Sequence, residues 1–438
     1  FGLGLVCAIV LSCIDYRALA RLWPLHVAVT WGLVLLTLVL HNFQIAGFTI
    51  GYAPSNTTNY SWILMPGGIS IQPTELAKIS FILTLAMHLD NVRERINQPV
   101  ELLKVLAHIL VPVLVVHQQG DDGTAIVFAA IGCMMLFCAG LSWKYIAGGF
   151  GVLGLGLVGL VLLFPDKLKG YQLDRIIALF DPDNPDPLIQ DTIRQQKRGR
   201  TAIGAGQIFG RGLFGEKHTR VIKAENDFVF SYMAECIGFV GCAIVLGALF
   251  TIAIRTLVIG LHSNGRMGMY ICAGVFATIA WQIIINLGMN LMLLPVIGVT
   301  LPFFSAGGTS VLMLYLCVGL VLSVYRHERF GGRLVVSPLG RSCPLYANKK
   351  RQFEALRASN WRFLLCWVWP ARASVEEGLS RRSAPPPNAQ WRCGGSCTRC
   401  SDVPACLCTW RAGTYCREPA QAPECSAKSG PRPLNRQG

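Results

Sequence analysis

The sequence predicts an all-α polytopic membrane protein, and three observations lead to this class. Hydrophobic residues make up 53% of the chain and charged residues 14%, with a mean hydropathy of +0.47. Apolar runs recur along the chain at about the length that a bilayer core demands. One long polar segment, residues 165–227, lies between two of these runs. It is too charged to sit in lipid and too varied in composition to be a flexible spacer, so we expect one large loop outside the bilayer.

The net charge of +15 is concentrated at the C-terminal end. From Arg326 onward the chain holds 19 Lys and Arg residues against 7 Asp and Glu residues. The rest of the chain is therefore nearly neutral, as an integral membrane body should be. This distribution argues against a nucleic-acid partner.

About nine spanning helices are expected from the apolar runs. They cover residues 1–14, 25–42, 74–89, 103–118, 122–141, 145–164, 228–254, 268–294 and 309–325. The first run is apolar from Phe1, without an initiator Met, a basic region or a cleavage site, so it is not a signal peptide. We expect it to be the remainder of a longer helix, in a chain truncated at its N-terminus.

Basic residues lie in alternate loops and predict the orientation. They are Arg17, Arg21, Arg93, Arg95, Lys104, Lys144, Arg255, Arg266, Arg326, Arg329 and Arg333. By the positive-inside rule these loops and the C-terminal tail are cytoplasmic, and residues 43–73, 165–227 and 295–308 face outward. The loop 165–227 is also basic, but long loops cross the membrane regardless of their charge.

Ionisable residues at membrane depth are the first candidates for a functional site, because each is costly unless it is paired or faces water. Glu75 and Lys78 stand three apart, on one face of the same helix, and are close enough to pair. The pair either serves function or only fixes helix packing. Asp121 and Asp122 begin the run 122–141, where carboxylates also act as simple helix caps.

The segment 294–310, LPVIGVTLPFFSAGGTS, is the second candidate. Pro295, Pro302, Gly307 and Gly308 interrupt helical structure, and nearby hydroxyls come from Ser305, Thr309 and Ser310. Irregular backbone near membrane depth is tolerated where it is buried in protein or lines a wet cavity. A tight turn with a helix cap at Thr309 or Ser310 explains the same pattern.

Five ordered motifs carry a resemblance to a known family. They are QPTELAK at 72–78, QGDDGTA at 119–125, AIGAGQIFGRGLFGE at 202–216, NDFVFSYMAE at 226–235 and LPFFSAGGTS at 301–310. Over about residues 1–328 the chain resembles the SEDS family (shape, elongation, division and sporulation), of RodA, FtsW and SpoVE type, with the elongation type closest. The resemblance implies a ten-helix fold, of which this chain lacks the first helix.

The resemblance implies a peptidoglycan glycosyltransferase that polymerises lipid II at the outer face of the bacterial cytoplasmic membrane. A sugar hydroxyl attacks an anomeric carbon that carries undecaprenyl pyrophosphate, which requires a general base and stabilisation of the leaving group. Asp227 matches the family's catalytic Asp. Without the resemblance, an N-cap of the following helix is the simpler reading of Asp227.

Further site residues follow from the motifs. The implied substrate-binding residues are Gln72, Glu75, Lys78, Asp121, Thr124, Lys197, Arg200, Ser305, Gly307, Gly308 and Thr309. Lys197, Arg198 and Arg200 suit a pyrophosphate, although a solvated loop face is the alternative. No metal-ligand cluster is evident in the membrane body, and we expect no cofactor beyond a divalent cation, magnesium or manganese, whose use stays open. The implied partners are membrane lipid and a class B penicillin-binding protein.

Departures from the family motifs concern substrate contacts more than the reaction. The stretch Gln119 to Thr124 has lost the family's proline and gained a second acid at Asp122. Ser61 replaces a family Arg before Trp62, and Glu225-Asn226 replaces His-Thr before Asp227. Ala306 stands where an aromatic residue is common.

The tail, residues 329–438, differs from the rest of the chain. It is rich in Arg, Pro and Cys, and we expect it to be disordered or non-native. A zinc site at Cys393, Cys397 and Cys400 is disfavoured by irregular spacing.

Two other functions compete with the polymerase: a lipid II flippase, for which many helices and a buried ion pair serve equally well, and a scaffold that only recruits a partner synthase.

Overall fold

The structure is a computed structural model that describes residues 1–53, 59–149, 187–213 and 224–334, with single positions at 151, 154, 179, 218, 219 and 221. All of them belong to one compact unit, Phe1–Val368. The tail beyond Leu334, with its cysteines, lies outside the described residues, as does most of the expected span 145–164.

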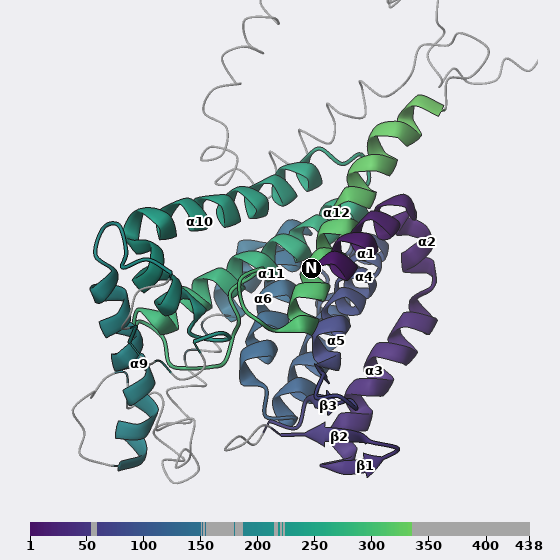
Figure 1. Cartoon of the computed structure of the whole chain (residues 1–438). Coiled ribbons are helices and arrows are strands. Elements are labelled where there is room, and N and C mark those ends of the chain that lie inside the picture. Colours follow the sequence, from purple (N-terminus) through teal and green to yellow (C-terminus); the bar gives the residue numbers. More distant parts are fainter. Residues whose placement is uncertain are drawn as a thin grey trace, which may run out of the picture. The chain divides into compact units, whose positions relative to one another are not determined.

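Helices dominate the described part of the chain (Figure 1). They are α1 (Gly2–Cys13), α2 (Tyr16–Arg21), α3 (Trp23–Val39), α4 (Pro73–Val92), α5 (Pro99–Gln118), α6 (Asp122–Cys138), α9 (Pro187–Gly206), α10 (Val229–Leu261), α11 (Arg266–Asn290) and α12 (Gly308–Leu334).

The predicted membrane class is confirmed. Within the described residues, α5, α10, α11 and the part of α12 up to Glu328 are long and apolar enough to cross a membrane, and α1, α3 and α6 are shorter apolar helices. Helix α4 has the required length of 20 residues but carries polar and charged side chains inside the bundle. Each of these eight helices coincides with an expected span.

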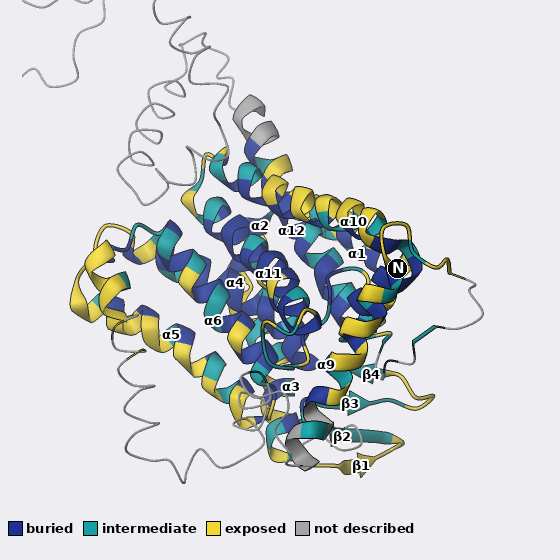
Figure 2. Cartoon of the chain, turned by 90° about the vertical axis from the view of Figure 1, so that its left-hand side faces the viewer, coloured by how far each residue is buried: buried dark blue, intermediate teal, exposed yellow. Residues whose placement is uncertain are grey.

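Apolar side chains cover the outside of the bundle as well as its interior. On α5, Val105 and Ile109 are buried, while Leu110, Val111 and Leu114 on the opposite face are 52%, 59% and 56% exposed. Figure 2 shows the same division, with exposed residues along the outer side of α5 and α10 and buried residues between the helices. A helix that is apolar all round suits a hydrocarbon environment.

Helix α11 forms the centre of the bundle, since it packs against α4, α6, α10 and α12. One stripe of its buried surface is polar. Thr278, Gln282, Asn286 and Asn290 follow one another at four-residue spacing, and none is more than 2% exposed. Because residues four apart lie on one face of a helix, they form a continuous polar stripe inside an apolar bundle.

The loop 43–73 contains a small antiparallel sheet that the sequence analysis did not predict. Strands β1 (Phe43–Ile45), β2 (Phe48–Tyr52), β3 (Trp62–Leu64) and β4 (Ser70–Ile71) pair in sequence order. Ala46 and Gly47 join β1 to β2 with φ angles of 48° and 82°, as a tight hairpin turn requires. Strand β4 leads directly into α4 and so determines where Gln72 lies.

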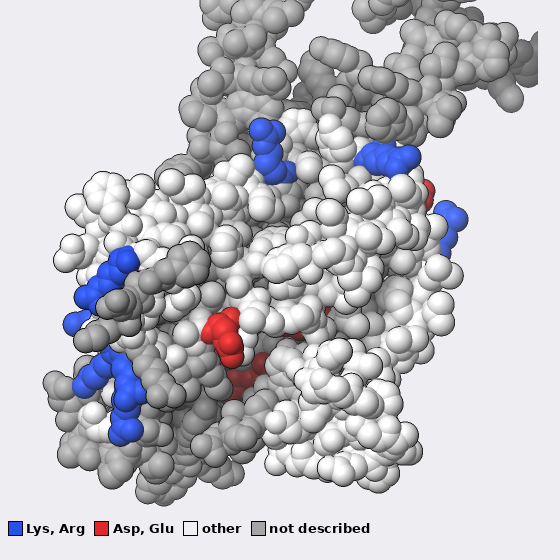
Figure 3. All heavy atoms as spheres, in the orientation of Figure 1, with Lys and Arg blue, Asp and Glu red and all other residues white. Residues whose placement is uncertain are grey.

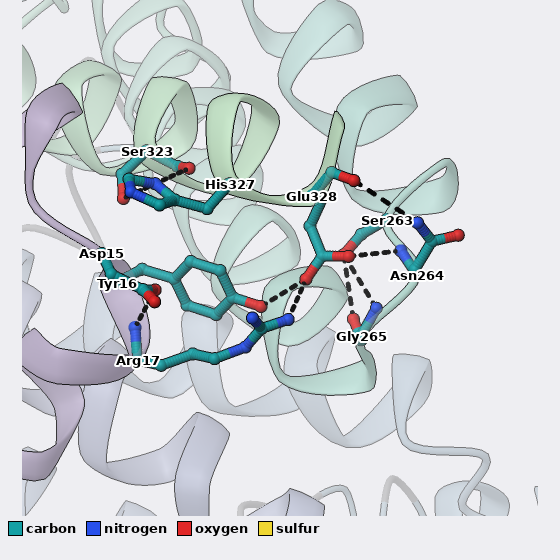
Figure 4. Close-up of polar contacts among 9 residues, drawn as sticks. All are labelled: Asp15, Tyr16, Arg17, Ser263, Asn264, Gly265, Ser323, His327 and Glu328. Atoms are coloured by element: carbon teal, nitrogen blue, oxygen red, sulfur yellow. Dashed lines mark hydrogen bonds and ion pairs between the residues drawn. The ribbon is translucent and has the colours of Figure 1, made fainter. Parts of the chain in front are cut away.

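A polar cluster joins three helix ends (Figure 4), at the end of the bundle away from this sheet (Figure 1). The buried carboxylate of Glu328 accepts hydrogen bonds from the Tyr16 hydroxyl and the Arg17 guanidinium, both at 2.6 Å, and from the backbone N–H of Asn264 at 2.9 Å. The α1–α2 corner, the α10–α11 loop and the end of α12 are therefore at the same end of the bundle. The positive-inside rule assigned these same segments to one side.

Helix α10 is broken at Gly238, whose φ of 66° is not helical. The residues after α9 complete the hydrogen bonding at the break. The carbonyls of Glu235 and Cys236 accept hydrogen bonds from the N–H groups of Arg211 and Gly212, and the N–H groups of Phe239 and Val240 donate to Gln207 and Ile208. Irregular backbone at membrane depth is tolerable when its polar groups are satisfied in this way.

Replacing Gly206 with Ala is expected to destabilise the close contact between the end of α9 and α10. A Cβ at Gly206 would overlap the carbonyl oxygen of Ala234, which cannot move without distorting α10. We expect a cost of about 1–3 kcal/mol or more, seen as a lower thermal unfolding temperature in detergent. Gly204→Ala is the matched control, because this exposed position in the same helix has nothing within 4 Å of an added Cβ. Equal stability of the two variants would contradict the close contact between Gly206 and α10.

Candidate active site

The loop before α10 is held through its backbone by the segment before α12. The carbonyl of Glu225 accepts a hydrogen bond of 2.8 Å from the N–H of Ala306. The next carbonyl, that of Asn226, accepts one of 2.8 Å from the Ser305 hydroxyl. The same Ser305 oxygen accepts a hydrogen bond from the N–H of Leu301. Ser305, a predicted site residue, therefore fixes the loop that carries Asp227.

The carbonyl of Asp227 is held by α11. It accepts hydrogen bonds from Nδ2 of Asn286 at 2.9 Å and from Nδ2 of Asn290 at 3.2 Å. Three successive carbonyls, at residues 225, 226 and 227, are thus bonded to groups far away in the sequence. These hydrogen bonds fix the position of the Asp227 backbone, from which the side chain extends.

The Asp227 side chain is neither fully buried nor fully exposed. Helix α10 begins at Val229, and its N-cap position is Phe228, so the structure does not support Asp227 as the N-cap residue. The carboxylate lies near the backbone of Gly298, where an added Cβ would come 3.9 Å from Oδ2. Gly298 has a φ of 70°, which suits glycine.

Gln72 and Asp121, both predicted site residues, are bonded directly to one another. The Gln72 amide donates to Oδ2 of Asp121 and, at 3.2 Å, to the hydroxyl of Ser61. The Gln72 N–H donates to the Thr309 hydroxyl at 3.3 Å. Oδ1 of Asp121 accepts a hydrogen bond of 3.1 Å from the N–H of Thr124. Four predicted residues from three sequence motifs therefore meet in one buried polar cluster.

Asp121 is the N-cap of α6, so the capping interpretation is correct, and the residue also has a tertiary role through Gln72. Burial raises the pKa of its carboxyl group above the usual range, and the hydrogen bonds from Thr124 oppose this rise. The charge of Lys78 lowers the same pKa and that of Glu75 raises it.

The predicted pairing of Glu75 with Lys78 is confirmed. Nζ of Lys78 lies 2.7 Å from Oε1 of Glu75, and the side chains of Lys78 and Glu75 are 1% and 6% exposed. Within the described part of the chain, Glu75 Oε2 and the Thr74 hydroxyl have no hydrogen-bond partner. A buried acceptor left without a partner is costly, so this region suits a further polar group or water. A role for the pair in substrate binding stays a prediction.

The two carboxylates Asp121 and Asp227 lie at the same end of the bundle, joined by the segment between α11 and α12. Ser305, in this segment, holds the Asp227 loop, and Thr309, in the first turn of α12 directly after it, contacts Gln72. The start of α6 also touches the segment, because a Cβ at Gly123 would overlap the carbonyl of Ile297. Figure 3 shows acidic side chains in a hollow near the middle of one face, with basic side chains towards its edges.

Lys197 and Arg200, the two predicted basic site residues, belong to α9. Both are exposed on α9, whose inner face meets α10 at Gly199, where a Cβ would lie 2.8 Å from the Ser231 hydroxyl. Gly307 and Gly308 stand at the start of α12, and nothing lies within 4 Å of an added Cβ at Gly308. Substrate contacts by these four residues stay predictions.

Among the described residues, no three His, Cys, Asp or Glu side chains lie close enough together to hold a metal ion. The divalent cation considered for the pyrophosphate stays a prediction.

Asn286 and Asn290 were not predicted as site residues. The available signal was their spacing, since Thr278, Gln282, Asn286 and Asn290 place an amide or hydroxyl at every fourth residue of an otherwise apolar span. Burying a polar side chain in such a span costs free energy unless it has a hydrogen-bond partner. Polar residues at regular spacing therefore indicate that neighbouring segments supply polar partners along this face of the helix.

The apolar helical bundle defines a polytopic membrane protein. Its buried ion pair and the Asp227 loop, which is held at one end of the bundle, define a preorganised polar site. The comparisons with known proteins give the family. A family model described as "Cell cycle protein", of FtsW, RodA and SpoVE type, matches residues 1–330. The chain belongs to this family.

Curated relatives agree with the family. The chain is 31% identical over 325 residues to a probable peptidoglycan glycosyltransferase FtsW of Trichlorobacter lovleyi, covering 73% of this chain and 80% of that protein. It is 29% identical to the stage V sporulation protein E of Bacillus subtilis, covering 75% and 86%. It is 32% identical to the peptidoglycan glycosyltransferase MrdB of Escherichia coli K12, covering 60% and 70%.

Solved structures show the same fold. One chain, from a peptidoglycan synthase complex that coordinates polymerisation and crosslinking, aligns with a TM-score of 0.61 and 29% identity, covering 75% of this chain and 87% of that chain. The rod shape determining protein RodA of Thermus thermophilus aligns with a TM-score of 0.50 and 28% identity, covering 75% and 85%.

Proposed function

We propose that this protein is a peptidoglycan glycosyltransferase that polymerises lipid II into glycan strands at the outer face of the bacterial cytoplasmic membrane. The observation that carries the proposal is the Asp227 loop, which is bonded at three successive carbonyls and leads into a membrane helix. Its relatives FtsW and MrdB bear the name of this activity. Preorganised groups at a reacting centre are the main source of catalysis in such a site.

In the proposed reaction Asp227 acts as the general base. A sugar hydroxyl forms a new bond to the anomeric carbon of the second substrate, and its proton passes to the Asp227 carboxylate. The bond from that carbon to undecaprenyl pyrophosphate breaks, and the pyrophosphate leaves with the electron pair. Proton transfer to a positioned carboxylate typically contributes about 10²–10⁴-fold to the rate.

The proposed orientation rests on the residues at the two ends of the bundle. Arg17 and the end of α12 meet in the Glu328 cluster at one end. Gln72, which follows strand β4, and Asp121 lie at the other end, together with the Asp227 loop that the segment before α12 holds. We place the basic end and the C-terminal tail in the cytoplasm by the positive-inside rule, so the site faces outward.

The proposed division of the chain is a membrane domain at 1–328 with a cytoplasmic tail at 329–438. The proposed partner is a class B penicillin-binding protein that supplies the crosslinking step. The similarity to a chain of the solved peptidoglycan synthase complex, in which polymerisation is coordinated with crosslinking, supports such a partner.

The test is a comparison of polymerisation with transport in the same liposomes. The purified protein is reconstituted with the penicillin-binding protein and given lipid II, and both glycan strands and lipid II reaching the opposite leaflet are measured. Glycan strands support the proposal. Lipid II that crosses the bilayer without forming strands would instead favour a flippase, for which the buried Glu75–Lys78 pair is equally suitable.

A further inference from the structure

The polar stripe on α11 divides into two parts with different partners. The hydroxyl of Thr278 donates to the carbonyl of Gly274 in its own helix, at 2.9 Å. Asn286, two turns further on, instead donates out of the helix to the carbonyl of Asp227. Asn290, one turn beyond it, donates to the same carbonyl at 3.2 Å and to the carbonyl of Asn286 in its own helix at 2.8 Å. The outer part of the stripe therefore contacts the loop that carries the proposed base.

Both asparagines are themselves fixed. The amide of Asn286 also donates to the carbonyl of Val299 at 2.8 Å. Oδ1 of Asn290 accepts a hydrogen bond of 2.6 Å from the Ser231 hydroxyl in α10. Each amide thus has a defined orientation, and each joins α11 to a neighbouring segment as well as to Asp227.

The asparagines are 0% exposed, so a substrate does not reach them in this structure. Their hydrogen bonds to Asp227 go to its backbone carbonyl and not to its carboxylate. Because the carbonyl and the side chain share one Cα, two hydrogen bonds to the carbonyl restrict where the carboxylate can point. A misplacement of about 1 Å in such a group can cost about 10²-fold in rate.

We propose that Asn286 and Asn290 are positioning residues, which hold Asp227 in its reactive orientation through its backbone carbonyl. This inference rests on the proposed function, because it concerns the base of that reaction. The inference adds to the proposed function a role for the central helix α11. The last turns of this helix support the site from inside the bundle, where the two asparagines are buried.

The experiment measures polymerisation by Asn286→Ala and Asn290→Ala in the liposome assay, with kcat and KM determined separately. We expect kcat to fall about 10²-fold at unchanged KM, because the orientation of the base changes while the substrate contacts remain. Rates are expressed per molecule of monodisperse protein, and thermal unfolding is measured in parallel. A loss of folded protein is thereby separated from a loss of rate.

Thr278→Val is the matched control. It removes a buried polar group from the same helix face, but one whose hydroxyl donates within its own helix. If the asparagine variants keep the kcat of this control, or if their KM rises while kcat is kept, the positioning role is wrong. If the parent forms strands and Asp227→Asn forms them equally well, Asp227 is not the base and the inference fails with it. If the parent forms no strands, the proposed function itself is wrong.

Discussion

Asp227→Asn is expected to lower the rate of glycan polymerisation by about 10²–10⁴-fold, the contribution typical of a general base. The amide has the size of the carboxylate but cannot accept the proton of the attacking hydroxyl. The two hydrogen bonds from α11 to residue 227 should be kept, because they go to its backbone carbonyl. The measurement is strand formation from lipid II by the reconstituted protein, beside thermal unfolding of both forms.

Glu225→Gln is the matched control for this prediction. It removes a negative charge two residues away in the same loop, from an exposed residue whose backbone carbonyl is bonded to Ala306. We expect it to retain most of the parent rate. Comparable losses in both variants would indicate that the general negative charge of the loop matters, and not a base at residue 227.

Breaking the Glu75–Lys78 pair is expected to have the largest effect on stability. Lys78→Met leaves the carboxylate of Glu75 buried without its counter-charge, and Glu75→Gln does the same to the ammonium group of Lys78. Removing one partner of a buried pair typically costs about 3–5 kcal/mol. Each single variant should therefore unfold at a clearly lower temperature in detergent.

The double variant Glu75→Gln/Lys78→Met distinguishes the two interpretations of the pair. With both charges removed, most of the stability should return, because no charge remains buried alone. If the double variant also polymerises lipid II at the parent rate, the pair only fixes helix packing. A stable but inactive double variant would assign the pair to the substrate site. Single variants as stable as the parent would show that the pair is not desolvated as the structure indicates.

The α10 region shows a limit of sequence patterns. Residues 228–254 are apolar apart from a few residues such as Ser231 and Glu235, and the sequence analysis expected one spanning helix there. The chain breaks at Gly238, because the loop after α9 supplies hydrogen-bond partners for both broken ends. Glycine permits such a break but does not require it, so the run alone could not predict it.

The sequence by itself determined the membrane class, the course of the spans and the Glu75–Lys78 pair. These features depend on local quantities: apolar runs of bilayer length, and two side chains one turn apart on a helix. The family motifs also indicated Asp227, Gln72, Asp121, Ser305 and Thr309 as site residues.

Only the tertiary structure decided which of these residues meet and what holds them. Gln72 and Asp121 are 49 positions apart, and Asp227 is 59 and 63 positions from the two asparagines that bind its carbonyl. The strands of the small sheet likewise depend on pairing with one another, since none exceeds five residues. Such contacts follow from the packing of whole helices around α11, and no local pattern contains that packing.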